Sequence, residues 1–276
     1  MSTAPAGPER GPRRPPLLRR RRVLRGARVL LTGGSSGVGR ALAAELSRRG
    51  ASLFVTARRE TLLESLAAEH PVAWLPGDVT VDAFRRRLVA EARERLGGID
   101  LVVAAAGSGA IGRFATSDPT TLRRVMEIDF FAPAELVRLS LPILREGRDP
   151  AVVLVGSILG LHPLPLHADY CAAKAALHAL AGTLRAELAP EGIDVLLAAL
   201  GPTESEFWGH LLAGSRPAWS RGRPLGAGAT ARAIADALER RRALVCPGLS
   251  AKGFSLAARF FPRFLDRAVA RRMARG

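Results

Sequence analysis

Cysteine, tyrosine and lysine are all scarce in this chain of 276 residues. Its two cysteines, Cys171 and Cys246, stand in neither a paired nor a metal-ligand spacing, so no disulfide framework and no metal site are expected. That usage favours a reducing compartment. No uncharged apolar run reaches the length of about 18 residues that a membrane-spanning helix needs, and the sequence predicts no such helix.

Acidic residues are also few, 25 against 41 basic ones, and the formal net charge is +16. The excess lies at the two ends, because residues 1–28 carry +8 and residues 240–276 carry +9, which leaves about −1 for residues 29–239. A nucleic-acid-binding domain places its basic residues on a structured face. The neutral middle of the chain therefore speaks against nucleic acid as a partner. A salt-sensitive DNA complex, lost on deletion of residues 1–26, would be needed to revive that idea.

The first 26 residues are rich in proline, glycine and arginine and show no sustained apolar periodicity. This composition predicts a disordered basic leader over residues 1–26. A secretory signal needs an apolar segment before a small-residue cleavage site. The first apolar run after the arginines, residues 29–31, belongs to a predicted strand, so we expect no signal peptide and a cytoplasmic location.

From residue 27 onward, short apolar runs alternate with amphipathic helical patterns. Near-continuous apolar strands joined by helical crossovers indicate a parallel sheet covered on both faces. No interior linker divides the chain, so the sequence predicts an α/β fold, a doubly wound parallel sheet of Rossmann type in a single domain over residues 27–249. The expected strands are 27–32, 52–56, 72–75, 99–105, 151–157, 193–199 and 243–246, and the expected helices are 38–49, 60–69, 81–97, 118–145, 168–189 and 229–241.

A glycine-rich turn, residues 32–39 with the sequence TGGSSGVG, follows the first predicted strand and runs directly into a helix. Glycines let a backbone turn tightly and approach a pyrophosphate, whose charge is favoured at a helix N-terminus. An ordinary tight βα loop is the alternative. The position after the first strand and before an amphipathic helix favours the nucleotide site.

The second predicted strand ends in Ala57-Arg58-Arg59. In NAD sites an acidic residue near this point holds the ribose 2′-hydroxyl, whereas arginine accommodates a 2′-phosphate. No acidic residue stands at this turn before Glu60. A solvated pair of charges at a helix start is the alternative, but with the glycine-rich turn upstream we expect NADP rather than NAD.

Tyr170 is the chain's one tyrosine, and Lys174 follows it by four residues, on the same face of a predicted helix. A nearby ammonium favours the phenolate of a tyrosine, which brings proton exchange with a substrate oxygen closer to neutral pH. A surface pair is the alternative. Ser157 ends the preceding apolar strand, and its hydroxyl can hydrogen-bond the same carbonyl oxygen, which favours catalysis.

These motifs together resemble the short-chain dehydrogenase/reductase family, in its short single-domain branch, over about residues 27–246. Residues 32–39 match TGxxxGxG, Tyr170 to Lys174 match YxxxK, and Ser157 stands at the family's serine position. Asp78-Val79 resembles the turn after the third strand that contacts adenine. Residues 200–203, LGPT, resemble the turn after the sixth strand that lies beside the nicotinamide.

The resemblance implies a role for each matched residue. Tyr170 would be the general acid and base, Ser157 would polarise the substrate carbonyl, and Lys174 would lower the pKa of Tyr170 and bind the nicotinamide ribose. The implied partners are a small-molecule substrate and further copies of the chain. The implied cofactor-binding residues are Gly33, Ser35, Ser36, Gly37, Val38, Arg58, Arg59, Asp78, Val79, Ala106, Gly107, Tyr170, Lys174, Gly201 and Thr203.

The sequence departs from the family pattern at two places. The family's NNAG reads AAAG at residues 104–107, which we expect to weaken local hydrogen bonding without removing activity. The family's fourth catalytic residue, an asparagine, falls at Asp129. An ionised aspartate accepts hydrogen bonds but donates none. If the relay needs the backbone carbonyl, Asp129 serves; if it needs the amide, turnover is slow.

Two stretches that flank the substrate in the family, residues 158–167 and 203–219, are largely apolar here. They favour a hydrophobic substrate, and the alternative is a lid that packs on the domain. Two histidines in the first stretch, His162 and His167, lack ligand spacing and are expected to be structural or solvent-facing.

Residues 250–276 are expected to form one basic amphipathic helix. Its arginines recur four apart beside phenylalanine and leucine, which suits peripheral contact with an anionic membrane. Docking on the domain or on a partner subunit is the alternative, and the pattern does not separate the two.

The function expected from all these features is an NADP(H)-dependent oxidoreductase that interconverts a carbonyl and an alcohol on a hydrophobic small molecule. A catalytically weak nucleotide-binding or interaction protein on the same fold is the alternative. The presence of Ser157, Tyr170 and Lys174 together favours the enzyme.

Overall fold

The computed structural model describes residues 20–217 and 224–273. At its centre lies a seven-stranded sheet with the order β3-β2-β1-β4-β5-β6-β7, in which every neighbouring pair is parallel. The predicted doubly wound parallel sheet is confirmed. The strands are β1 (Arg28–Thr32), β2 (Ser52–Ala57), β3 (Val72–Pro76), β4 (Leu101–Ala104), β5 (Ala151–Ser157), β6 (Asp194–Leu200) and β7 (Leu244–Val245).

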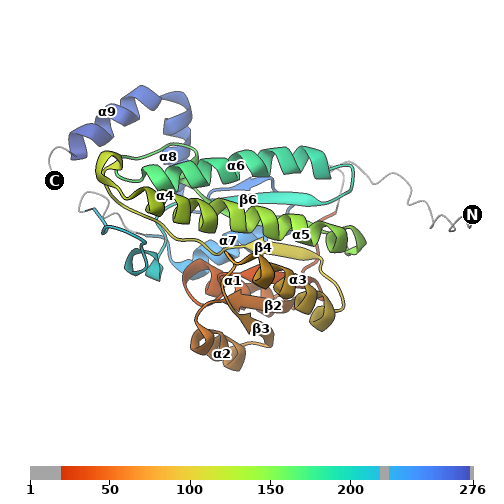
Figure 1. Ribbon diagram of the computed structural model, residues 1–276. Helices are drawn as coiled ribbons and strands as arrows, with labels where there is room; N and C mark the ends of the chain where they lie inside the picture. The colour runs from red at the N-terminus through yellow and green to blue at the C-terminus, as the bar shows by residue number, and fades with distance from the viewer. Residues whose placement is uncertain (1–19, 218–223, 274–276) are drawn as a thin grey trace, which may run out of the picture.

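Helices cover the sheet on both faces (Figure 1). One layer holds α1 (Gly37–Arg48), α2 (Glu60–Glu69) and α7 (Ala227–Glu239). The opposite layer holds α3 (Asp82–Leu96), α4 (Pro119–Met126), α5 (Ala132–Glu146) and α6 (Ala168–Leu188). Short helical turns lie at Phe114–Thr116 (η2), Ile158–Gly160 (η4) and Glu206–Gly209 (η5).

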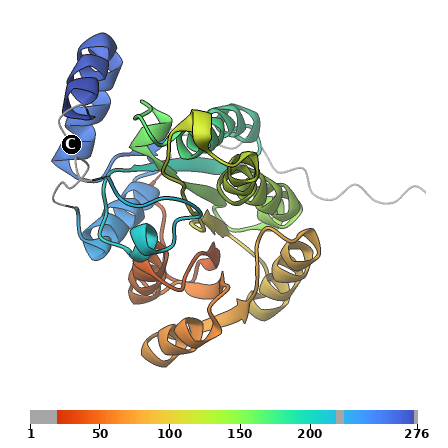
Figure 2. The ribbon, with the colours of Figure 1, turned by 60° about the vertical axis from the view of Figure 1, so that its left-hand side comes forward.

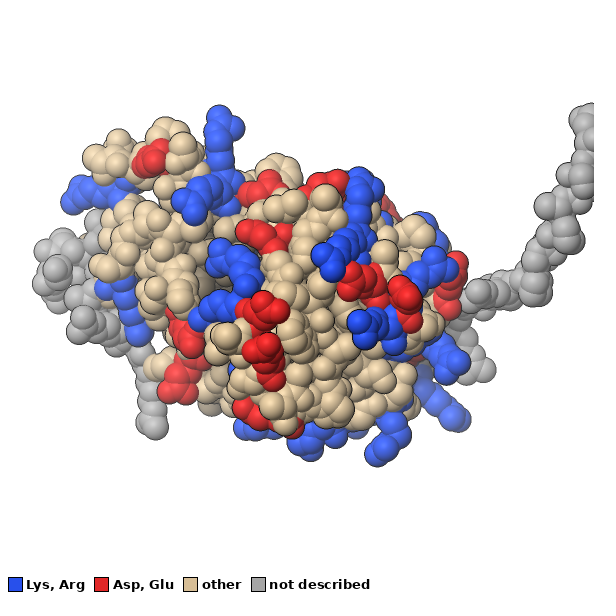
Figure 3. All heavy atoms as spheres, turned by 60° about the horizontal axis from the view of Figure 1, so that its bottom comes forward, with Lys and Arg blue, Asp and Glu red and all other residues tan. Residues whose placement is uncertain are grey.

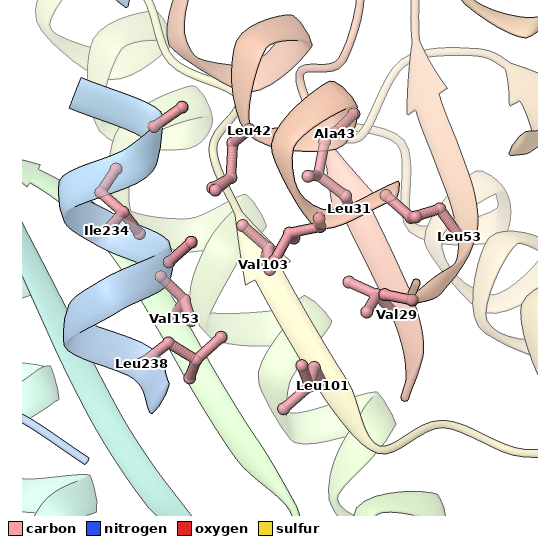
Figure 4. Close-up of a cluster of buried hydrophobic side chains, with 14 of the residues drawn as sticks. Val29, Leu31, Leu42, Ala43, Leu53, Leu101, Val103, Val153, Ile234 and Leu238 are labelled. Carbon is pink, nitrogen blue, oxygen red and sulfur yellow. The ribbon is translucent and has the colours of Figure 1, made fainter. Parts of the chain in front are cut away.

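Each face of the sheet packs its own apolar core because the central strands carry apolar residues in both directions. In β1, Leu31 faces α1 and α7, whereas its neighbour Leu30 faces the α3–α6 layer. Figure 4 shows the first core, where Leu42 of α1 and Ile234 of α7 meet the strands. Burying a side chain of this size contributes about 1.5–3 kcal/mol, so apolar packing holds both layers of helices on the sheet.

That order reverses direction between β1 and β4, since the chain builds β1 to β3 on one side and β4 to β7 on the other. In sheets of this type, ligands bind in the crevice beyond the carboxyl ends of the strands at the reversal. The glycine-rich turn follows β1 and the 104–107 segment follows β4, so both lie at this point.

Residues 20–26, which the sequence analysis assigned to the leader, pack on the domain. Arg22 and Leu24 are buried, with 3% and 2% of their surfaces exposed. The Arg22 guanidinium lies 2.8 Å from a carboxylate oxygen of Asp194 and donates to the carbonyls of Asp149, Pro150 and Leu238. Residues 1–19 of the predicted leader lie outside the described residues.

Two long helical predictions are interrupted in the structure. The helix expected over residues 118–145 contains a π-helical turn, η3 (Glu127–Phe131), between α4 and α5. The helix expected over 250–276 is two helices, α8 (Leu249–Phe260) and α9 (Pro262–Met273). The cause is Pro262, which has no amide hydrogen and disfavours helical geometry in the residue before it, Phe261 (φ −132°, ψ 51°).

Candidate active site

One cavity of about 600 Å³ opens at the carboxyl ends of the strands. Every residue that the sequence singled out for catalysis or cofactor binding lines it, so positions far apart in the chain meet in one place. These residues are Gly33, Ser35, Ser36, Gly37, Val38, Arg58, Arg59, Asp78, Val79, Ala106, Gly107, Asp129, Ser157, Tyr170, Lys174, Gly201 and Thr203.

The glycine-rich turn forms a cradle that side chains would fill. Gly33 has φ +79°, and a Cβ on it would lie 2.6 Å from the amide nitrogen of Ala106. A Cβ on Gly39 would lie 2.0 Å from the carbonyl oxygen of Gly33. The first turn of α1 begins at Gly37, so its amides point toward this cradle. The arrangement fits the pyrophosphate of a dinucleotide.

Thr32 ties this cradle to the end of β4. Its hydroxyl accepts hydrogen bonds from the amides of Ala105 and Ala106, at 3.2 and 3.3 Å. These bonds hold the backbone of residues 105 and 106 against the cradle. On the neighbouring rim, Asp78 accepts from both the amide and the hydroxyl of Thr80, at 2.9 and 2.8 Å, which fixes the turn after β3.

The two arginines after β2 differ in their contacts. Arg58 is exposed at the cavity edge. Arg59 donates to the hydroxyl of Ser35 at 3.3 Å and to the carboxylate of Glu206 at 2.7 Å. The Arg59 guanidinium holds the pKa of the Glu206 carboxyl below its usual value. Sequence reasoning missed Glu206, because nothing in the local pattern links a residue of η5 to the end of β2.

Ser157, Tyr170 and Lys174 come together from β5 and α6. Ser157 ends β5 and Tyr170 lies in the first turn of α6, and both side chains line the cavity. The Lys174 ammonium lies 5.7 Å from the centre of the Tyr170 ring. Phe207 packs edge-on against the same ring, with the centroids 5.5 Å apart. A substrate oxygen placed beside Ser157 therefore meets the Tyr170 phenol.

A buried ion pair lies behind Tyr170. Oδ1 of Asp129 is 2.9 Å from Nζ of Lys174, and the two side chains are 0% and 5% exposed. Nζ also donates to the carbonyl of Val155 at 3.1 Å, and Asp129 accepts from the amide of Ser108 at 3.3 Å. Burial disfavours the ammonium, but Asp129 and the Tyr170 phenol together outweigh it, and the pKa of Lys174 is raised. Burial also raises the pKa of the Asp129 carboxyl, against the effect of the Lys174 ammonium.

This pair changes the expectation for Tyr170. Lys174 does favour the phenolate, as the sequence predicted, but removal of the phenol from water has the larger effect and Asp129 adds to it. The pKa of Tyr170 is therefore raised above its usual value rather than lowered. The π-helical turn of η3 carries Asp129 inward toward α6, an arrangement that spacing along the sequence does not reveal.

A half-buried histidine that the sequence analysis did not consider lies one turn beyond Lys174. His178 packs against the backbone of β5, where a Cβ on Gly156 would lie 2.5 Å from its Nε2. Burial, together with the Lys174 charge, lowers its pKa to about 4. His178 is therefore neutral near pH 7 and adds no positive charge beside Lys174.

The end of the cavity next to Tyr170, away from the glycine-rich cradle, is lined by large apolar side chains. Phe207 and Trp208 of η5 line it, as the sequence predicted, and so do Ala251 and Phe254 of α8, which it did not. His162 is buried, in agreement with a structural role, and its Nε2 lies 3.1 Å from Oδ1 of Asp266. His167 is buried as well, and desolvation lowers its pKa.

Within residues 20–217 and 224–273, no group of three or more histidine, cysteine, aspartate or glutamate side chains is placed to hold a metal ion. None of the helices in these ranges combines the length and hydropathy needed to cross a bilayer. On the face shown in Figure 3, basic and acidic side chains are intermingled.

Comparison with known proteins gives the family. Residues 27–215 match the short chain dehydrogenase family. A short chain dehydrogenase of Pseudocercospora fijiensis is 36% identical over 194 residues, 67% of this chain and 62% of that protein. A human hydroxysteroid 11-beta-dehydrogenase 1-like protein is 33% identical over 180 residues, 63% of this chain and 57% of that protein. The chain thus spans about three fifths of the length of the curated relatives it matches.

A solved structure agrees with these matches. The crystal structure of a short-chain dehydrogenase from Streptomyces avermitilis superimposes with a TM-score of 0.77 at 32% identity, over 86% of this chain and 94% of that one. The chain belongs to the short-chain dehydrogenase/reductase family.

Proposed function

We propose that the protein is an NADP(H)-dependent oxidoreductase that interconverts a carbonyl and an alcohol on an apolar small molecule. The observation that carries this proposal is the meeting of Ser157, Tyr170 and Lys174 in the same cavity as the glycine-rich cradle. A site that had lost its chemistry would not need to keep all three side chains together.

In the reductive direction, the Tyr170 phenol donates its proton to the substrate oxygen while the Ser157 hydroxyl holds that oxygen in place. The nicotinamide dinucleotide, when bound, supplies or takes up the hydride. Lys174 is a three-fold donor, and Asp129 and Val155 take two of its N–H groups. The third is available for a ribose hydroxyl. Asp129 acts through Lys174 and is a positioning residue in this scheme.

The preference for NADP over NAD rests on Arg58 and Arg59 at the end of β2, where NAD-dependent proteins of this fold place an acidic residue. A 2′-phosphate between the two guanidiniums would make charge-assisted hydrogen bonds. The 2′-phosphate would compete with the Glu206 carboxylate for Arg59. Because Arg59 is already paired, we expect Arg58 to contribute more to the preference for NADP.

An apolar substrate is proposed because Phe207, Trp208 and Phe254 line the end of the cavity next to Tyr170. One group of relatives is named for hydroxysteroids, so fused-ring alcohols and ketones belong in the first screen. We also propose that the chain associates with further copies of itself. The location we propose is the cytoplasm, with peripheral contact to a membrane.

The direct test is a screen of apolar ketones with NADPH and of the matching alcohols with NADP. Turnover of at least one compound, absent in a Ser157→Ala and Tyr170→Phe double variant, supports the proposal. The alternative, a catalytically weak nucleotide-binding protein, is favoured by the charge of Asp129 at Lys174. It predicts tight NADPH binding without turnover of any compound in the screen at any pH.

A further inference from the structure

Five large apolar side chains gather in the exposed parts of α8 and α9 and the turn between them. Leu249 and Leu256 belong to α8, and Phe260, Phe261 and Phe264 lie at the turn into α9. Each is between 58% and 86% exposed. Figures 1 and 2 show α9 standing off from the body, connected to it through α8. Clusters of this kind on a protein surface mark contact with another protein or with lipid. We call the five side chains the apolar hairpin face.

Basic residues accompany the apolar hairpin face. Four arginines recur four residues apart, and all four are exposed: Arg259, Arg263, Arg267 and Arg271. The one acidic residue between positions 250 and 276 is Asp266, whose carboxylate lies against His162. Aromatic side chains beside a stripe of arginine are typical of helices that lie in the headgroup region of an anionic membrane.

The same charge pattern argues against a second copy of the chain as the occupant. A symmetric contact brings a surface onto itself, so residue faces equivalent residue. Here it would place arginine against arginine with a single carboxylate, Asp266, to offset them. Like charges opposed across an interface are strongly unfavourable. An anionic lipid surface supplies the complementary charge.

The apolar hairpin face also adjoins the cavity. Ser250, Ala251 and Phe254 of α8 line its apolar end, and a Cβ on Gly201 would lie 2.9 Å from the Cβ of Ala251. His162, in the loop after β5, packs edge-on against Phe254 with the centroids 5.9 Å apart. The helix that carries part of the exposed face therefore forms a wall of the substrate end.

We infer that α8 and α9 dock on an anionic membrane surface through the apolar hairpin face and its arginines, and that the cavity takes its apolar substrate from that lipid. The docking stands on the exposed face and charge alone, whereas the uptake of substrate rests on the proposed function. The expected substrate class is an alcohol or ketone that partitions into lipid.

Docking is tested by flotation of the full chain with vesicles of pure phosphatidylglycerol and of pure phosphatidylcholine. The protein should float with the first and stay unbound with the second, and raised salt should weaken binding. Phe260→Ser with Phe261→Ser and Phe264→Ser should weaken binding by about tenfold or more. Arg263→Glu with Arg267→Glu should weaken it by a similar factor.

Matched controls use exposed positions away from the hairpin. Arg87→Glu with Arg95→Glu reverses the same charge on α3, which lies on the other side of the molecule (Figure 1), and Phe114→Ser removes an exposed phenylalanine elsewhere. Both should leave flotation unchanged. Docking is overturned if the hairpin variants bind phosphatidylglycerol as the unmodified protein does. A second result also overturns docking. In that result the protein binds neither kind of vesicle, and light scattering shows that the three phenylalanine-to-serine exchanges abolish a contact between subunits.

Uptake from lipid has a separate readout. A substrate found in the screen is offered in phosphatidylglycerol vesicles and, in parallel, in detergent micelles. The three serine exchanges should raise the apparent KM with vesicles and leave it unchanged with micelles. An equal KM in vesicles for both proteins overturns the uptake. Docking without turnover of any compound would instead leave the docking standing and count against the proposed function.

Discussion

The carboxylate of Asp129 lies 2.9 Å from the ammonium of Lys174, in a pair that is almost wholly buried. Burial raises the pKa of the Asp129 carboxyl and disfavours the Lys174 ammonium, but Asp129 and the Tyr170 phenol raise the pKa of Lys174 on balance. Lys174 therefore stays an ammonium, and its charge lowers the pKa of Tyr170. Burial of the phenol has the larger effect and Asp129 adds to it, so the pKa of Tyr170 is raised.

Exchange of Asp129 for asparagine should make Tyr170 easier to ionise. Alcohol oxidation needs the phenolate, so its rate rises as pH passes the pKa of Tyr170. Asparagine keeps an acceptor for Lys174 but removes the negative charge that raises this pKa. Asp129→Asn should therefore move the midpoint of kcat for oxidation to lower pH and increase turnover below neutral pH.

The profile of Asp118→Asn provides the control, since Asp118 caps α4 on the surface. A midpoint that stays in place, or moves upward, in Asp129→Asn would contradict this account of the pair. Leaving Lys174 without a counter-ion also costs stability, which we expect to stay below about 3 kcal/mol because the hydrogen bond is kept. Denaturant unfolding measures that cost.

The sequence predicted the sheet and the cradle well because their signals are local. Residues 151–155, AVVLV, are apolar throughout, and every residue of β5 is buried. The glycines of residues 32–39 are required by contacts within the turn and with its nearest neighbours, as Gly33 and Gly39 show. Periodicity and turn chemistry carry such features without reference to distant residues.

The sequence predicted less where a contact joins distant parts of the chain. The position of Asp129 was clear, but its pairing with Lys174 depends on a π-helical turn and on how α6 packs. Arg22 looked like one more arginine in a polar leader, although it is buried against Asp194, 172 residues away. Pro262 predicts the break between α8 and α9, but the arginines that recur every four residues favoured one continuous helix.

Arg22 should matter for stability and not for chemistry. Its guanidinium satisfies three backbone carbonyls and the Asp194 carboxylate at the end of the sheet away from the cavity. Removing one partner from a buried ionic network typically costs about 3–5 kcal/mol. Arg22→Ala should lower the free energy of unfolding by roughly that amount, measured by urea titration, while kcat per folded molecule stays the same.

The neighbouring Arg21 is exposed and gives the matched control, for which no measurable change is expected. Should Arg22→Ala and Arg21→Ala prove equally stable, the body of the protein would begin later than the structure indicates.

Cofactor choice should follow the arginines after β2. A charged hydrogen bond to a 2′-phosphate contributes about 1.5–3 kcal/mol, or roughly ten- to a hundredfold in affinity. NADPH should bind at least about tenfold tighter than NADH in a fluorescence titration, with a smaller gap at high salt. Arg58→Asp should narrow or reverse this gap, because it removes the partner and adds a carboxylate for the ribose hydroxyl.

Glu206 offers a change in the opposite direction. Its carboxylate lies 2.7 Å from the Arg59 guanidinium. Glu206→Gln should release that guanidinium and raise the affinity for NADPH several-fold, while the affinity for NADH changes little. Equal affinities for the two nucleotides in the unmodified protein would remove the NADP assignment and leave the proton chemistry untouched.

The central claim is that Tyr170 passes the proton to and from the substrate oxygen, and Tyr170→Phe tests it most directly. Phenylalanine keeps the ring that packs 5.5 Å from Phe207 and removes the hydroxyl alone. Single-turnover reduction of a ketone found in the screen should slow by about 10²- to 10⁴-fold, the usual contribution of a general acid. NADPH should bind this variant as tightly as the unmodified protein. A variant that binds NADPH and reduces the ketone at the unmodified rate would contradict the mechanism.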